Sequence, residues 1–119
     1  GSGSATALLV GMFDPLDSQA VAEVARLAQR GRVRVLVLGD SFASGRRLLA
    51  RSADRVEVVR HVRGVFEAIE VVDTGHLQRL LDIEGLSTPV SWMSDLRWAP
   101  QLATVRQIGL EEPALRTTA

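Results

Sequence analysis

Short apolar runs alternate along the chain with stretches in which apolar residues recur every three or four positions. The first pattern is typical of buried strands and the second of amphipathic helices. The apolar runs predict strands at residues 5–11, 32–40, 65–72, 88–94 and 104–109. The helical spacing predicts helices at residues 18–31, 52–64 and 74–85, and the segment 41–52 is predicted to be a loop with room for a short helix.

Residues at the helix ends and on the apolar helix faces support these boundaries. Gly31, Gly64 and Gly85 follow the three helical patterns and are typical stop residues. Ser52 or Asp54 is expected to cap the start of the second helix. The apolar residues at helical spacing in the first helix are Ala20, Val21, Val24, Leu27 and Ala28, and in the third helix Leu77, Leu80 and Leu81 are expected to face the core.

Strands that alternate with helices predict βαβ units and therefore a parallel sheet. We expect a Rossmann-like three-layer α/β sandwich with about five parallel strands and helices on both faces. Ligands of such sheets bind at the carboxyl ends of the strands. Three segments stand at such ends: the loop after Gly11, the loop after Asp40, and the segment around Ser94 and Asp95.

The length of 119 residues suits one ordinary domain. We assign residues 5–119 to that domain and residues 1–4, the sequence GSGS, to an expression scar. The formal net charge is zero, which argues against a nucleic-acid partner because such proteins usually carry a basic excess. The sequence displays no signal peptide and no apolar run long enough for a bilayer, so we expect a cytoplasmic protein without membrane insertion.

All 14 basic residues are arginines, and the chain has no cysteine. Mechanisms that need a lysine amine, a thiolate or a cysteine-ligated zinc are therefore excluded. The abundance of Ala, Val, Leu, Gly and Arg suggests a GC-rich, bacterial genome. No residue is assigned as a metal ligand.

The segment VGMFDPLDSQA, with the helix and strand that follow it, suggests a family. It resembles the opening of the cytidylyltransferase-like nucleotidyltransferases, above all the small glycerol-3-phosphate cytidylyltransferases, whose motif has the form GxFDxxHxGH. Gly11, Phe13 and Asp14 match that motif. Further along, RSADRVEVVRHVRGVFEAIEVV resembles the family's helix that runs into a short strand, and PVSWMSDLRW resembles its fourth-strand ending of the type VMGDDW.

The resemblance implies a set of nucleotide-binding positions, if nucleotide binding is retained. Arg46 and Arg47 fall near the family's lysines after the second strand, and Arg55 falls on an arginine that holds substrate phosphates. Asp95 and Trp98 fall near the GDDW-type segment. The full set is Gly11, Met12, Phe13, Asp14, Arg46, Arg47, Arg55, Asp95 and Trp98. The family's cofactor and substrate, Mg²⁺ and CTP, are implied only if transferase activity is retained.

The two motif histidines are missing, because Asp17 and Ala20 stand at their positions. The resemblance implies that those imidazoles stabilise the phosphates during transfer, and loss of one such donor typically costs about 100- to 1000-fold in rate. Asp17 or Ser18 is well placed to cap the first helix, and a carboxylate there would compete with a phosphate for the same N–H groups.

The sequence therefore favours a degenerate, catalytically impaired member of this fold that acts as a binding, regulatory or oligomerisation module. Its expected partner is a second copy, with the helix around Val56 to Val62 as a dimer surface, or another domain of a larger protein, and a nucleotide or phosphate is a possible ligand. The alternative is an active nucleotidyltransferase that forms a CDP- or ADP-linked product with diverged phosphate-binding residues.

A second alternative comes from VLVLGDSFASG, which looks like the first block of the SGNH (GDSL-type) hydrolases. In that interpretation Ser41 is the nucleophile, and the DTGH segment supplies Asp73 and His76 as orienting carboxylate and base. The competing interpretation is structural: Ser41 is a turn residue after the second strand, and His76 lies exposed in the first turn of the third helix.

Overall fold

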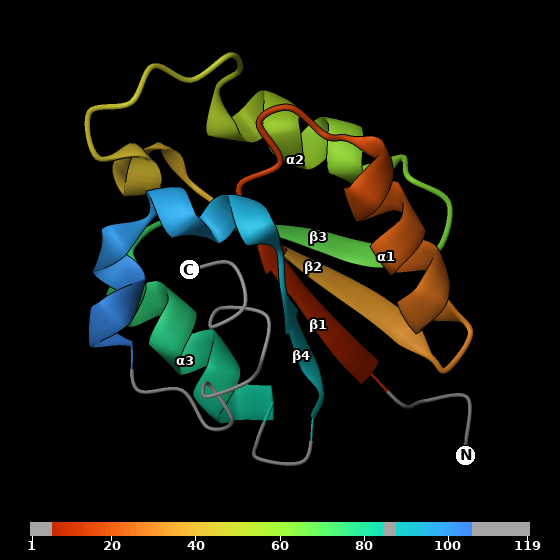
Figure 1. The fold of residues 1–119 in the computed structure, drawn as a ribbon. Coiled ribbons are helices and arrows are strands. Elements are labelled where there is room, and N and C mark those ends of the chain that lie inside the picture. The colour runs from red at the N-terminus through yellow and green to blue at the C-terminus, as the bar shows by residue number, and fades with distance from the viewer. Residues whose placement is uncertain (1–5, 85–87, 106–119) are drawn as a thin grey trace.

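The computed structural model describes residues 6–84 and 88–105. In that part of the chain, one parallel sheet has the order β3-β2-β1-β4, and its strands are β1 (Thr6–Gly11), β2 (Arg32–Leu38), β3 (Val65–Val71) and β4 (Val90–Trp92). The helices are α1 (Ser18–Ala28), α2 (Ser52–Arg60) and α3 (Thr74–Glu84). Helices α1 and α2 lie on one side of the sheet and α3 on the other (Figure 1). The predicted Rossmann-like α/β fold is therefore confirmed.

The sheet has four strands within the described residues, where the sequence predicted about five. The predicted fifth strand began at Thr104, but Thr104 belongs to the 3-10 helix η4 (Pro100–Thr104). The rest of that predicted strand, residues 106–109, lies outside the described residues, as does the predicted expression scar.

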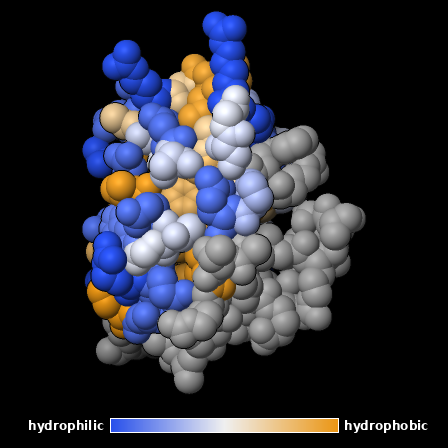
Figure 2. Space-filling view, turned by 90° about the vertical axis from the view of Figure 1, so that its left-hand side faces the viewer, coloured by the Kyte–Doolittle hydropathy of each residue, from blue (hydrophilic) through white to orange (hydrophobic). Residues whose placement is uncertain are grey.

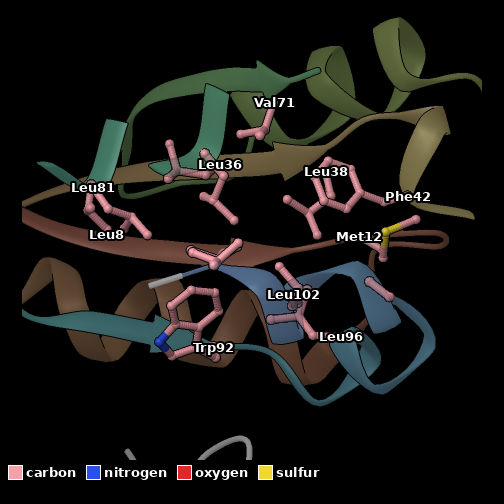
Figure 3. Close-up of a cluster of buried hydrophobic side chains, with 14 residues drawn as sticks. Leu8, Met12, Leu36, Leu38, Phe42, Val71, Leu81, Trp92, Leu96 and Leu102 are labelled. Carbon is pink, nitrogen blue, oxygen red and sulfur yellow. The ribbon is translucent and has the colours of Figure 1, made fainter. Parts of the chain in front are cut away.

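The two faces of the sheet bury separate apolar clusters. Under α1 and α2, the cluster is formed chiefly by Val24, Leu27, Val33, Val35, Val37, Val56 and Val59. On the other face, α3 and the 3-10 helices η3 (Ser94–Trp98) and η4 cover a second cluster, which Figure 3 shows between the sheet and these helices. That cluster includes Leu8, Leu36, Leu38, Phe42, Leu77, Leu81, Trp92, Leu96 and Leu102. The central strands β1 and β2 are therefore covered on both faces, as their continuous apolar runs predicted.

Three predictions about helix ends are wrong, and one of them is the end of α2, which lies at Arg60, before the predicted stop at Gly64. Helix α1 ends at Ala28, before the predicted stop at Gly31, and Val21, one of its apolar residues at helical spacing, is 43% exposed. Helix α2 begins at Ser52, so the capping position is Arg51, and no side chain caps it. Ser52 instead donates its hydroxyl hydrogen to Glu70 Oε2 at 2.7 Å, which makes it a tertiary contact with β3.

The order of the strands creates a switch point between β1 and β4. The chain passes from β1 outward to β2 and β3 through α1 and α2 on one face, and returns to the far side of β1 through α3 on the other face (Figure 1). The carboxyl ends of β1 and β4 therefore flank the crevice at which open α/β sheets bind ligands.

The surface on the side of α3 and the 3-10 helices is mainly hydrophilic where it is described, with apolar groups in small patches (Figure 2). In the part of the chain that the structure covers, no helix combines the length and the apolar content needed to cross a bilayer.

Candidate functional site

The loop after β1 and the segment after β4 meet at the switch point. Asp95, in η3, accepts hydrogen bonds from the backbone N–H of Met12 at 3.1 Å and of Phe13 at 3.0 Å. Two successive N–H groups that converge on one carboxylate have the geometry of a backbone anion site. The side chain of Asp95 thus takes the place that an external anion would occupy at this loop.

Burial raises the pKa of Asp95 above the ordinary value of an aspartic acid. The hydrogen bonds from Met12 and Phe13 lower the pKa, but they do not cancel the rise. The negative charge of Asp17 raises the pKa further, whereas the positive charge of Arg46 lowers it. The site is therefore already crowded with negative charge around a partly desolvated carboxylate.

Asp17 caps helix α1, as the sequence predicted. Its backbone is extended, with φ −128° and ψ 179°, and its Oδ1 accepts the N–H of Ala20 at 2.9 Å. This N–H is one of the unpaired donors that make a helix N-terminus attractive to anions. Asp17 and Ala20, which stand at the two histidine positions of the family motif, are therefore joined by a hydrogen bond from the Ala20 N–H to the Asp17 carboxylate.

Phe13 and Gly11 shape the loop. Phe13 is buried with a left-handed backbone, φ 55°. A Cβ atom on Gly11 would lie 2.9 Å from Cζ of the Phe13 ring and 2.9 Å from Cγ of Met93, so only glycine fits without a shift. These two matches to the motif serve the packing of the loop.

Asp14 holds a neighbouring loop in place. Its carboxylate accepts the N–H of Leu49 at 2.8 Å and of Ala50 at 3.0 Å, in the segment that leads into α2. Asp14 therefore joins the loop after β1 to the loop before α2.

Arg55, for which the resemblance implies a role in phosphate binding, is buried and hydrogen-bonded to the protein. Only 2% of it is exposed. Its guanidinium donates to three carbonyl oxygens, those of Met12 at 2.8 Å, Leu38 at 2.7 Å and Ala50 at 3.1 Å. It also donates to Asp40 Oδ1 at 2.7 Å. With four N–H bonds committed to the protein, the guanidinium joins the carboxyl ends of β1 and β2 to the start of α2.

The other predicted cations lie on the surface. Arg46 and Arg47 follow the 3-10 helix η2 (Asp40–Ala43) and are exposed. Arg46 is near enough to Asp95 for its charge to lower the pKa of that carboxyl. Trp98 ends η3, and its side chain lies outside the described residues.

Ser41, Asp73 and His76 gather near the carboxyl end of β3 but do not form a relay. The Ser41 hydroxyl donates to the carbonyl oxygen of Val72, and His76 Nδ1 accepts the N–H of Val72 at 3.0 Å. The Asp73 carboxylate accepts the backbone N–H of His76 at 2.8 Å. The serine proton and the imidazole Nδ1 are therefore both engaged with the backbone, which gives no support to the hydrolase alternative.

A hollow of about 440 Å³ lies between α1 and β4, at the switch point. Gln19, Glu23 and Arg26 line it from one side of α1, and Ser91, Trp92, Met93 and Ser94 line it from β4 and the residues that follow. Within the described ranges, no group of three or more His, Asp or Glu side chains could hold a metal ion.

The sequence did not identify the roles of Asp40 and Glu23. Asp40 pairs with Arg55, and Glu23 accepts from Arg26 and from the Ser91 hydroxyl, which donates at 2.9 Å. The only local signal is the spacing of Glu23 and Arg26, three residues apart on a helix. The contact with Ser91 joins positions 68 residues apart and leaves no trace in a local pattern.

Comparison with known proteins gives one informative result. No family model and no curated protein matches the sequence. Among solved structures, the lipopolysaccharide core biosynthesis protein from Thermoplasma volcanium GSS1 is similar with a TM-score of 0.57 and 17% sequence identity. The match covers 76% of this chain and 96% of that chain. At this identity, the similarity establishes a shared fold.

Proposed function

We propose that the chain is a nucleotidyltransferase-like domain that does not transfer nucleotides and serves as a binding, regulatory or oligomerisation module. One observation carries the proposal: the N–H groups of Met12, Phe13 and Ala20 already donate to the carboxylates of Asp95 and Asp17. The resemblance in the sequence and the shared fold support the assignment to this structural class.

A phosphate at this loop would have to displace the two carboxylates or lie beside them. Two unit charges 4 Å apart repel each other by roughly 4 kcal/mol at an effective dielectric constant of 20. The missing histidines would remove a further stabilisation of developing charge. Asp17 and Asp95 both bind backbone N–H groups, so these residues do not fit a magnesium-bound triphosphate.

The test is a calorimetric titration with CTP and with ATP, with and without Mg²⁺, together with an assay for pyrophosphate release. We expect no pyrophosphate release from the wild type. The double variant Asp17→Asn/Asp95→Asn removes both charges and keeps an asparagine cap on α1, so its affinity for CTP should rise about tenfold or more. The matched control is Asp54→Asn, an exposed carboxylate on α2. Magnesium-dependent pyrophosphate release by the wild type would contradict the proposal.

The active transferase is the second candidate, and one observation favours it. Arg46 and Arg47 are exposed, and the charge of Arg46 reaches Asp95 at the switch point. In this case Asp17→His should add nothing to a wild type that is already active. Under our proposal the same variant gains nucleotide affinity. A histidine at position 20 is a poor probe because Ala20 is 2% exposed and leaves no room for an imidazole.

We also propose that the module associates with a second copy through α2. Val56 and Val59 pack in the core, so the predicted dimer surface narrows to the outer side of the helix, where Val58 is 53% exposed. Val58 and Leu49 border an apolar hollow of about 300 Å³. The exposed charges of α2 include the ion pair between Glu57 and Arg60, so the apolar side chain of Val58 is the feature that would carry the contact between two copies.

A further inference from the structure

The hollow between α1 and β4 continues to the amino-terminal edge of the sheet, the edge opposite Asp95. A smaller hollow of about 170 Å³ lies there, and it shares Arg26 and Ser91 with the larger one. Arg30 and Thr6 also line it, and no carboxylate is among the residues of its lining. The two ends of this groove therefore differ in charge, because the other end, at Gln19 and Ser94, lies close in the sequence to the carboxylates of Asp17 and Asp95.

Arg26 is held in place on this groove. Its Nε donates to Glu23 Oε1 at 3.0 Å, its Nη2 donates to Glu23 Oε2, and Nη2 lies 3.4 Å from Ser91 Oγ. The Nη1 group has no hydrogen-bond partner among the described residues. A guanidinium that is fixed by a carboxylate on one edge offers its remaining N–H groups to an oxyanion with little loss of side-chain entropy.

Arg30 follows the end of α1 and lines the same smaller hollow as Arg26. Its backbone N–H bonds to the carbonyl oxygen of Leu27 at 3.0 Å, whereas its side chain has no ion-pair partner in the ranges that the structure describes. The two arginines bring two positive charges to the hollow. The negative charge of Glu23 and the negative end of the α1 dipole, which is equivalent to about half a charge, offset part of this positive charge. The balance favours an anion.

We propose that this groove binds a small polar molecule whose oxyanion, a phosphate or a carboxylate, sits between Arg26 and Arg30. The uncharged part of the ligand would lie in the larger hollow, which Gln19 and Ser94 line with an amide and a hydroxyl. The orientation rests on the proposed function, because the carboxylates of Asp17 and Asp95 disfavour an anion near the opposite end. It places the anion at the amino-terminal edge of the sheet, away from the β1–α1 loop.

The test is a titration of the ¹⁵N-labelled protein with inorganic phosphate and, separately, with acetate, followed by backbone amide NMR signals. We expect saturable shifts at Gly31 and Ser91 and none at Met12 or Phe13. The anion that binds with the higher affinity identifies the preferred oxyanion of the ligand. Arg30→Gln should weaken binding about tenfold, because a hydrogen bond to a charged group is lost.

Arg60→Gln is the control, because it removes the same charge from an exposed arginine on α2, which does not line the groove. It should bind phosphate like the wild type. Equal weakening by both variants, or shifts that do not saturate, would overturn the anion site. Shifts at Met12 and Phe13 in addition to Gly31 would overturn only the proposed closure of the β1–α1 loop, and shifts confined to Met12 and Phe13 would overturn both.

Discussion

The guanidinium of Arg55 joins the carboxyl ends of β1 and β2 to the start of α2, so its removal should lower the stability of the fold. In Arg55→Met, the carbonyl oxygens of Met12 and Leu38 lose a buried donor. We expect a loss of about 3 kcal/mol in the free energy of unfolding, measured by urea denaturation. Arg60→Met is the control and should change stability by less than about 0.5 kcal/mol, since its ion pair is exposed. Equal losses would mean that Arg55 is not a structural anchor.

Asp95 should leave a signature in the pH dependence of stability. Its pKa is raised in the folded protein, mainly by burial, so the folded state binds more protons than the unfolded state just above the ordinary aspartic acid range. The stabilising contribution is complete at lower pH and is lost as the pH rises through the folded pKa. We therefore expect the unfolding free energy of the wild type, relative to Asp95→Asn, to fall with rising pH in that window. A relative stability that rises there would contradict the raised pKa.

Single residues were predictable where their partners are local. Asp17 was expected to cap α1 because its acceptor lies three residues from the N–H it binds. Asp95 lies 83 residues from Met12, and Arg55 lies 43 from the same residue. No local pattern can reveal such contacts. The strand-end rule and the resemblance drew attention to Asp95, and the resemblance alone drew attention to Arg55, with an implied role in phosphate binding that the observed hydrogen bonds do not require.

At the scale of elements, the two helices α1 and α2 differ in how they begin. Asp17 caps α1 with its side chain, whereas α2 has no side-chain cap, although Asp54 stands in its first turn. Asp17→Ala should therefore cost about 1 kcal/mol, whereas Asp54→Ala should change stability by less than about 0.5 kcal/mol. Thermal unfolding of both variants would measure the difference, and a larger loss in Asp54→Ala would show that the capping assignment is reversed.

The positions of the elements followed from their periodicity, and their ends did not. The continuous apolar runs of β1 and β2 predicted central strands, because a strand covered on both faces needs apolar residues throughout. The start of α2 was ambiguous because Ser52 can cap a helix or bond to a neighbouring strand. Its hydroxyl bonds to Glu70 of β3, a choice that depends on how the helix packs on the sheet.

At the scale of the whole molecule, the alternation of strands and helices predicted a parallel sheet and a switch point, and the switch point brought Asp95 to the β1–α1 loop. The same topology leaves the outer side of α2 facing away from the sheet. Val58 on that side is 53% exposed, and Leu49, which precedes the helix and borders the same hollow, is 77% exposed. Exposed apolar side chains beside a hollow are typical of interaction sites. We propose that two copies associate through this surface about a two-fold axis.

This self-association predicts a mass near twice the 12.9 kDa of the chain in light scattering after size-exclusion chromatography. Val58→Asp would place a charge at the centre of the paired surfaces and should shift the population to the monomer with little loss of stability, because Val58 is half exposed. Val21→Asp is the control, since Val21 is a similarly exposed valine on α1, outside the α2 surface. A wild type that stays monomeric at high concentration would end the proposal of a homodimer. If both variants disrupt the dimer equally, the interface does not lie on α2.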